Sequence, residues 1–356
     1  YAVWRNPSYR LYSSSWFLLT FGAMMESVAV RHLVYQWTGE YLALGWIGLI
    51  RAMPVVMLAI PGGQMADRLD RRRVVVAMLG LSTAVACGLA AAVAWKLPIG
   101  WIYLLLGIGA VSQALGGPSR AALLPQIVPA ESFTNAVTWN SSVFQIASMT
   151  GPAAGGFLIK FAGSATDAFL LVAFCRVLSL LAMAGVRSQR PVGPQAAVSW
   201  ETLVAGVRFV WRTKLLLATI TLDLLAELLG GVTYLLPVFA EDVLQVGPDG
   251  MGLLQSAEAI GAVAMAVLLT HLPPMRRAGR ILLWSVAGYG VATIGFGLSP
   301  WFWLSMGMML LIGALDNISV VVRHTLVQML TPDEMRGRVS AVNNIFIVAS
   351  NDLGGM

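Results

Sequence analysis

The sequence has 356 residues, of which 58% are hydrophobic and only 11% are charged, and its mean hydropathy is +0.76. Soluble domains have roughly 45 to 50% apolar residues, so this composition excludes an ordinary soluble protein and predicts a polytopic membrane protein. The net charge of +6 does not indicate nucleic-acid binding, because the basic residues fall almost entirely between the apolar segments.

Ten apolar segments are long enough to cross a hydrocarbon core of about 30 Å as α-helices. Hydrophobic runs place them at 11–34, 42–61, 74–95, 100–124, 133–159, 166–186, 215–239, 249–271, 281–298 and 301–323. An eleventh segment begins near residue 339 and is still incomplete at Met356. We therefore expect an all-α fold whose C-terminal half is truncated, with ten full segments and part of an eleventh.

The distribution of basic residues predicts which side of the membrane each loop occupies. With a cytoplasmic N-terminus, the inner loops hold most of the arginines, whereas the outer loops keep little beyond Arg31, Lys96 and Lys160. Short cytoplasmic loops carry such an excess of arginine and lysine. The sequence thus predicts an N-terminus in the cytoplasm.

The loop after the second segment is the most charged part of the chain. A glycine-led turn at Gly62 and Gly63 precedes Asp67, Asp70 and four arginines. Asp67 can accept hydrogen bonds from backbone amides at a neighbouring helix N-terminus and can pair with arginines. We predict that this loop latches the outward-facing state. A purely topological role would explain the arginines but not the two aspartates.

A linker rich in proline, glycine, glutamine and alanine follows the sixth segment. It leads into an amphipathic stretch through Arg212 that we expect to lie along the cytoplasmic surface. The chain is therefore predicted to divide into an N-terminal six-helix half at 1–187, a linker with an amphipathic helix at 188–213, and an incomplete C-terminal half at 214–356.

An internal repeat supports this division. When the sequence is shifted by 203 residues, identical residues meet in register around the fourth and tenth segments. The matched pairs are Arg120 with Arg323, Leu123 with Leu326, Pro129 with Pro332, Glu131 with Glu334, Asn140 with Asn343, and Gly151 with Gly354. Two halves of six helices in the same order are predicted, a construction that is common in secondary transporters.

Ionisable residues inside the segments are costly in a membrane and mark functional sites by default. The acidic residues that we expect to couple protons are Glu26, Asp223, Glu227, Glu258 and Asp316. At about 1.5 Å per residue, Glu26 and Glu227 lie nearest the midplane and are the leading candidates. Arg51, well inside the second segment, is the expected partner of Glu26.

Asp223 and Glu227 are four residues apart and share one helix face. Two carboxylates that close in a low dielectric cannot both ionise at low cost, which is the property that a proton carrier needs. Alternatively, Asp223 pairs with an arginine from another segment. Glu258 is either a second carrier or lines the pore with Gln255, and both interpretations stay open.

The remaining intramembrane arginines are predicted to form a charge network or an inner gate. Asp316 and Arg323 are seven residues apart on one helix face. Their expected partner is Arg120 or Arg176. The equivalent repeat positions of Arg120 and Arg323 favour an inner gate or lipid-headgroup contacts over substrate binding.

The fifth segment combines a proline with small residues. Pro152 removes a backbone donor, while Gly151, Gly155 and Gly156 allow another helix to approach closely. Residues on this segment and the first one are also predicted to form a cavity wall for a bulky, partly apolar solute. They are Met24, Met25, Trp139, Asn140 and Gln145.

The sequence lacks the motifs of enzymes and ATP-driven pumps. It contains no Gly-x-x-x-x-Gly-Lys-Ser/Thr loop and no constellation of a nucleophile with a base. Cys87 and Cys175 lie in apolar segments without metal-like spacing, so no disulfide framework, metal or cofactor is indicated. We expect a protein that is not an enzyme.

Several motifs resemble the major facilitator superfamily of transporters. Its loop between spans two and three has the pattern Gly-x-x-x-Asp-Arg-x-Gly-Arg-(Arg/Lys), with Asp70 here where glycine is usual. The residues that fill this gate-loop pattern are Gly63, Asp67, Arg68, Arg71 and Arg72. The run Gly-Pro-Ala-Ala-Gly-Gly at 151–156 resembles an element of drug and proton antiporters. Stretches at 6–10, 121–125 and 331–343 resemble the branch that contains the enterobactin exporter and macrolide efflux proteins.

The resemblance implies a major facilitator fold of two six-helix halves in a bacterial inner membrane. It further implies a secondary transporter that alternates access and exports a small amphiphilic molecule, such as a macrolide or a siderophore, in exchange for protons. The expected partners are this molecule, protons and lipid, without nucleic acid, and the expected state is a monomer. A proton-coupled importer and a transport-inactive sensor or lipid-flipping protein stay open as alternatives.

Overall fold

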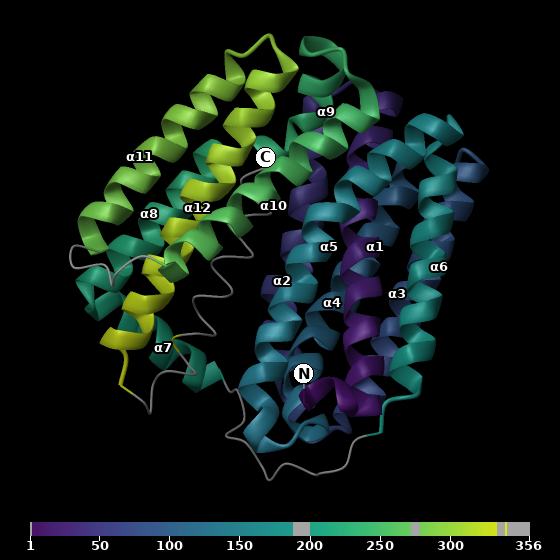
Figure 1. Ribbon diagram of the computed structural model, residues 1–356. Helices are drawn as coiled ribbons and strands as arrows, with labels where there is room; N and C mark the ends of the chain where they lie inside the picture. The colour runs from purple at the N-terminus through teal and green to yellow at the C-terminus, as the bar shows by residue number, and fades with distance from the viewer. Residues whose placement is uncertain (1, 188–199, 272–277, 333–338, 340–356) are drawn as a thin grey trace. The chain divides into compact units, whose positions relative to one another are not determined.

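The computed structural model of the chain describes residues 2–187, 200–271, 278–332 and 339, and within them every regular element is helical (Figure 1). The prediction of an all-α protein is confirmed for this part of the chain. The linker expected at 188–199 and the eleventh segment expected after residue 339 fall on residues outside it, as do the repeat partners Glu334, Asn343 and Gly354.

The chain forms two compact units, one within Tyr1–Thr38 and Ile50–Ser199 and the other within Gly39–Leu49 and Trp200–Met356. The long helices in the first half of the chain are α1 (Pro7–Thr38), α2 (Tyr41–Arg68), α3 (Arg71–Ala94), α4 (Ile99–Ile127), α5 (Phe133–Ala162) and α6 (Ala165–Ala184). The helices in the second half are α7 (Trp200–Arg212), α8 (Lys214–Gly230), α9 (Leu236–Val238), α10 (Gly247–His271), α11 (Ala278–Gly297) and α12 (Phe302–Leu330).

Nine helical stretches of the described residues are long and apolar enough to cross a membrane. They match nine of the ten predicted segments, and the tenth is α5, which has 30 residues. Polar side chains such as Asn135, Asn140 and Gln145 make the first half of α5 less apolar than the other helices. The chain is therefore a polytopic membrane protein.

In the first unit, α1 packs against α5 and α6, while α3 packs against α4 and α6. Glycines of α5 make the contact with α1 close, as the sequence predicts. A Cβ atom on Gly151 would lie 2.6 Å from the Cβ atom of Met24, and one on Gly155 would lie 3.2 Å from the Cα atom of Met25. This packing fixes the position of α1, the helix that carries Glu26.

In the second unit, α12 packs against α10 and α11, and α8 contacts α11 and α12 (Figure 1). Two glycines bring the backbones of α10 and α12 together. A Cβ atom on Gly261 would overlap the backbone of Leu310, and one on Gly313 would overlap the backbone of Glu258. The close approach places Glu258 beside the helix that carries Asp316.

The seventh predicted segment, 215–239, is confirmed as part of a membrane-length stretch at Lys214–Val243, but this stretch is not one continuous helix. Helix α8 ends at Gly230, and a 3-10 turn at Val232–Tyr234, the short α9 and a π-helix at Phe239–Val243 follow. Gly231 and Pro237 explain the interruption, because glycine weakens a helix and proline lacks an amide hydrogen. We call residues 230–243 the broken segment.

The second predicted segment also ends later than expected. Helix α2 continues through Gly62 and Gly63 to Arg68, so these glycines do not form a turn. Gly62 instead lets α2 approach α4, because a Cβ atom there would lie 2.5 Å from the carbonyl oxygen of Ala114. The connection to α3 contains only Leu69 and Asp70.

Candidate functional site

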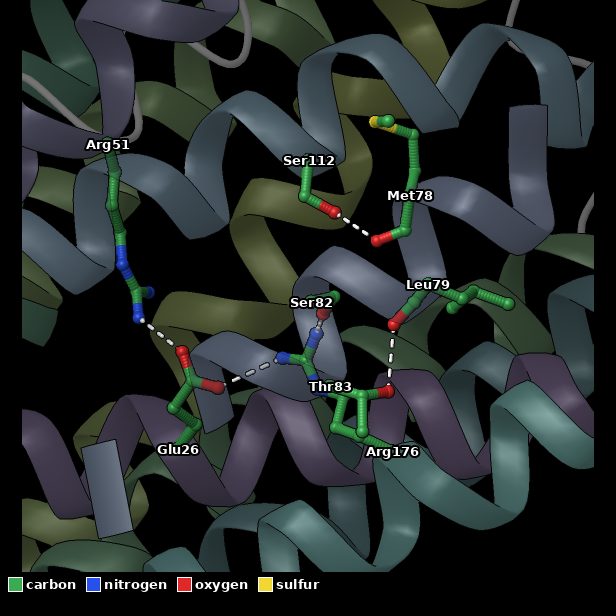
Figure 2. A network of polar contacts seen from close by, with 8 residues as sticks. All are labelled: Glu26, Arg51, Met78, Leu79, Ser82, Thr83, Ser112 and Arg176. Carbon is green, nitrogen blue, oxygen red and sulfur yellow. Dashed lines mark hydrogen bonds and ion pairs between the residues drawn. The ribbon is translucent and has the colours of Figure 1, made fainter. Parts of the chain in front are cut away.

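The interior of the first unit contains a carboxylate held by two arginines (Figure 2). Glu26 on α1 lies 3.4 Å from Arg51 on α2 and 2.9 Å from Arg176 on α6, measured between side-chain oxygen and nitrogen atoms. Arg176 also donates to the hydroxyl of Ser82 on α3. The side chains of Glu26 and Arg176 are only 11% and 12% exposed, so these charges are removed from bulk solvent.

This arrangement pairs Glu26 with Arg51, the partner expected from the sequence, and adds Arg176. Each carboxylate oxygen receives a charged donor, and such pairs are the strong hydrogen bonds of proteins. Removing one partner of a buried pair is costly because it leaves an uncompensated charge. The surroundings of Glu26 therefore suit a fixed ion pair better than a group that exchanges protons.

A third arginine of this unit, Arg120, lies on an aromatic face. Its guanidinium carbon is 3.8 Å from the ring centroid of Trp16, at a distance typical of cation–π contacts. The Trp16 ring also stacks with Phe144, with centroids 6.3 Å apart and planes inclined by 20°. The indole nitrogen of Trp16 donates to the backbone oxygen of Asn140 at 3.4 Å, which fixes the ring.

The second unit contains an ion pair between Asp223 on α8 and Arg323 on α12, whose side chains are 9% and 3% exposed. This contact corresponds to the alternative in which Asp223 pairs with an arginine from another segment. Arg323 thus pairs with Asp223 inside the second unit and Arg176 with Glu26 inside the first, and the expected network of Asp316 and Arg323 with Arg120 or Arg176 stays a prediction.

One helical turn beyond Asp223, three carboxylates gather. Glu227 lies close enough to both Glu258 and Asp316 to interact with them electrostatically. The hydroxyl of Thr233, in the broken segment, donates to Glu258 at 3.5 Å. Within the described residues, neither Glu227 nor Asp316 forms an ion pair, and no group of acidic residues, histidines and cysteines is arranged to hold a metal ion. We call Glu227, Glu258 and Asp316 the acidic cluster.

A cavity of about 10 Å³ adjoins the acidic cluster, and its volume is close to the room needed by a single water molecule. It is lined by Asp223, Ala226, Glu227, Ser285, Val286, Tyr289, Leu315, Asp316 and Ser319. The cavity is far too small for a drug-sized molecule, which needs at least roughly 300 Å³. The cavity can hold a water molecule, which can carry a proton, but it cannot hold a substrate.

Sequence reasoning missed Tyr289 of α11, which joins the acidic cluster to the broken segment. Its hydroxyl donates to the backbone oxygen of Gly230 at 3.1 Å, and the residue is 8% exposed. It therefore supplies a hydrogen bond where the helix ends. The available signal was a tyrosine between two glycines in the middle of an apolar segment, because a buried tyrosine hydroxyl needs a partner.

The connection between α2 and α3 is held together by side chains that bond to helix ends. Arg71 donates to the backbone oxygens of Ala66 at 2.9 Å and Ala122 at 3.2 Å. Asp70 caps α3 by accepting from the amide of Arg73 at 3.0 Å. These contacts give the charged loop a structural role within its own unit.

The other four residues of the predicted gate loop differ in their surroundings. Arg72 donates to the backbone oxygen of Ala184 near the end of α6, whereas Arg68 is exposed. Asp67 has one carboxylate oxygen that is shielded from solvent and has no hydrogen-bond partner among the described residues. Gly63 is buried inside α2 and does not belong to a loop.

Two residues of the predicted cavity wall make packing contacts, and the wall itself stays a prediction. Met25 is fully buried in an apolar cluster with Ala86 and Val172. Trp139 packs edge-to-face on Trp4, with ring centroids 5.4 Å apart. The other three expected residues lie half-buried on α1 and α5. They are Met24, Asn140 and Gln145.

The antiporter-like residues of α5 are all buried. They are Gly151, Pro152, Gly155 and Gly156. Pro152 lies inside the continuous helix, and the glycines on either side permit the contact with α1 described above. Their geometry is that of a packing surface and contains no ionisable side chain.

Comparison with known proteins places these features in a family. The family model of transmembrane secretion effectors matches residues 1–356. The enterobactin exporters EntS of Shigella dysenteriae serotype 1 and Escherichia coli O1:K1 are each 26% identical over 341 residues, which cover 95% of this chain and 81% of theirs. The chain therefore aligns with most of the length of these exporters.

Solved structures show the same fold at low sequence identity. A bacterial homologue of the human lysosomal transporter Spinster, inward-facing and occupied, matches with a TM-score of 0.72 at 16% identity, covering 98% of this chain and 80% of the other. A mutant of the peptide transporter POT gives 0.74 at 13% identity, with 98% and 87% covered. A D-xylose–proton symporter gives 0.67 at 14% identity, with 98% and 88% covered.

The full-length family match, the helical membrane architecture and the shared fold agree with one another. They identify a secondary transporter and not an enzyme. The chain belongs to the transmembrane secretion effector family of the major facilitator superfamily.

Proposed function

We propose that this transporter exports a small amphiphilic molecule across a bacterial inner membrane by alternating access, in exchange for protons. The observation that carries the proposal is the acidic cluster beside a water-sized cavity and a broken helix. The relatives named above support the direction of transport, because they are exporters. The predicted cytoplasmic N-terminus, which follows from the arginine distribution, is part of this proposal.

The acidic cluster has the property that proton exchange requires. Three carboxylates that lie close together in a low dielectric repel one another, so they are not all ionised at the same time. The proton that relieves this repulsion belongs to the cluster and not to a single residue. Glu227 and Asp316 line the cavity, through which water can deliver or remove the proton.

Broken membrane helices often surround the sites of secondary transporters, because irregular backbone is tolerated where it lines a cavity. Here Tyr289 and Thr233 connect the broken segment to the acidic cluster. A change in the charge of the cluster therefore acts directly on a segment in which the regular helix is interrupted. We propose that protonation of the cluster and rearrangement of the broken segment are coupled.

The charged connection between α2 and α3 is proposed to act as the cytoplasmic latch. Arg71 and Arg72 are occupied by backbone oxygens of their own unit, but Asp67 keeps a shielded carboxylate oxygen without a partner among the described residues. A buried and unsatisfied acceptor is costly. A contact that forms only in the outward-facing state would satisfy it, which is what a latch needs.

Transport by the full-length protein in inside-out membrane vesicles tests the proposal. The vesicles are acidified inside, and uptake of a radiolabelled macrolide and of a catecholate siderophore is measured. An exporter that exchanges protons accumulates its substrate and releases protons from the lumen. A proton-coupled importer does not accumulate it, and a transport-inactive protein shows no solute-dependent proton movement.

Glu227→Gln is the informative variant, because it removes a titrating group from the acidic cluster at nearly constant volume. We expect it to abolish accumulation driven by the pH gradient. Glu131→Gln, at an exposed position after α4, is the matched control and should transport at the parental rate. Equal transport by Glu227→Gln and the parent would exclude Glu227 as a proton carrier.

A further inference from the structure

Among the described residues of the first unit, Arg51, Arg120 and Arg176 outnumber the one carboxylate that pairs with them, that of Glu26. Arg51 and Arg176 share the single carboxylate of Glu26. Arg120 lies within electrostatic reach of Arg176 and forms no ion pair among the described residues. Two guanidinium groups near each other repel, so within the part of the chain that the structure describes the charge of Arg120 is not compensated. Such charge is expensive inside a membrane protein and is retained where it binds something.

Nearby polar groups do not supply the missing negative charge. The hydroxyl of Tyr12 donates its proton to the backbone oxygen of Arg120 at 3.2 Å, so this phenol is present in its neutral form. The indole of Trp16 donates to Asn140 and offers only its ring face to the guanidinium. The charge of Arg120 is thus supported by an aromatic surface and left available to an anion.

The aromatic surface continues beyond Trp16. Phe144 stacks on the Trp16 ring and is 40% exposed, so the aromatic surface that carries the guanidinium extends to an exposed apolar ring. A guanidinium group presents several N–H donors in one plane, which matches the two oxygens of a carboxylate or the oxygens of a catecholate. A molecule that carries such an acidic group on an aromatic or apolar skeleton would contact both parts.

We infer that Arg120, with Trp16 and Phe144, forms a binding site for the anionic group of an acidic aromatic substrate. The inference deepens the proposed function, on which it rests, by naming the substrate class. The site favours a catecholate over a macrolide whose amine is protonated, because three arginines in this unit repel a cation. It also changes the expectation for Arg120 from a gate to a substrate contact.

Equilibrium binding to the purified full-length protein in detergent tests this site. The probes are 1-naphthoate and its neutral analogue 1-naphthamide, which have the same ring system, and binding is measured by titration calorimetry. The parent should bind the acid more tightly than the amide. Arg120→Gln should weaken binding of the acid by about tenfold or more and leave the amide unchanged, since a charge-assisted contact is lost.

Two further variants serve as controls for the binding experiment with Arg120→Gln. Arg10→Gln, which removes an exposed arginine from the same helix as Trp16, should bind both probes like the parent. Unchanged binding of the amide also shows that Arg120→Gln is folded. If Arg120→Gln does not fold, Phe144→Leu serves instead, because the side chain of Phe144 is partly exposed and its replacement should be tolerated. It should weaken acid and amide by similar factors.

Three outcomes would overturn the site: no preference of the parent for the acid, a preference that survives in Arg120→Gln, or unchanged binding of both probes by Phe144→Leu. The measurement uses no proton gradient. Its failure would therefore leave proton-driven export intact, and loss of proton coupling in the vesicle experiment would leave this binding result intact.

Discussion

Glu26 and Glu227 are both carboxylates deep inside their helices, and the sequence alone treats them alike. Their surroundings differ, because Glu26 contacts two guanidinium groups whereas Glu227 faces other carboxylates around a small cavity. The first arrangement compensates a permanent charge, and the second opposes full ionisation. Glu26 is therefore expected to stabilise the fold, and Glu227 to exchange protons.

Replacing Glu26 should lower the stability of the protein, and it should not abolish proton coupling specifically. Glu26→Gln leaves Arg51 and Arg176 without a carboxylate, and removing one partner of a buried pair costs about 3 to 5 kcal/mol. Arg51→Gln should cost less, because Arg51 is 27% exposed and Glu26 keeps Arg176. Thermal unfolding of the purified variants checks the order. A stable Glu26→Gln protein that lost only proton coupling would contradict it.

The Asp223–Arg323 pair should show compensation when both charges are removed. Asp223→Asn and Arg323→Gln should each destabilise the protein by about 3 to 5 kcal/mol, since each leaves one buried charge alone. The double variant should be less destabilised than the sum of the two. A double-mutant cycle of unfolding measurements gives the coupling energy. Additive effects would show that the two side chains do not interact.

At the scale of elements, the broken segment is the feature that sets one helical span apart from the others. Its first residues are held by side chains of other helices, with Tyr289 bonded to Gly230 and Thr233 bonded to Glu258. Because Tyr289 bonds a backbone oxygen that a continuous helix would bond internally, the segment can rearrange without unfolding its neighbours. We expect it to respond to the protonation of the acidic cluster.

A substitution at Gly230 tests how closely the broken segment depends on Tyr289. A Cβ atom on Gly230 would lie 2.5 Å from a ring carbon of Tyr289, so Gly230→Ala should displace the ring and destabilise the protein by about 1 to 3 kcal/mol. Gly290→Ala on α11 is the control, because a Cβ atom there has nothing within 4 Å. Thermal unfolding and vesicle transport are measured for both variants, and only Gly230→Ala should differ from the parent. Equal behaviour would mean that the tyrosine moves freely.

For the molecule as a whole, hydropathy predicts the number and order of helices because each must match the thickness of the membrane. It does not predict where Gly231 and Pro237 interrupt a helix, since an interrupted span is as apolar as a continuous one. The pairing of Arg51 with Glu26 follows from the cost of buried charge, but the addition of Arg176 depends on how α6 packs. Contacts between helices that are distant in sequence can be identified only when the packing of the helices is known.

Alternating access requires contacts that form in only one of the two states of the molecule. The proposed latch at Asp67 is such a contact, and a substitution at Asp67 tests it. Asp67→Asn should leave membrane insertion unchanged and lower the transport rate by about tenfold, because a coupling contact of this kind is worth roughly 1 to 3 kcal/mol. Asp70→Asn is the matched control, since Asp70 is exposed and caps only α3. It should transport at nearly the parental rate. Initial rates of uptake into inside-out vesicles, normalised to protein content, make the comparison. If Asp67→Asn and Asp70→Asn transport equally well, the charged connection between α2 and α3 serves topology and helix capping alone.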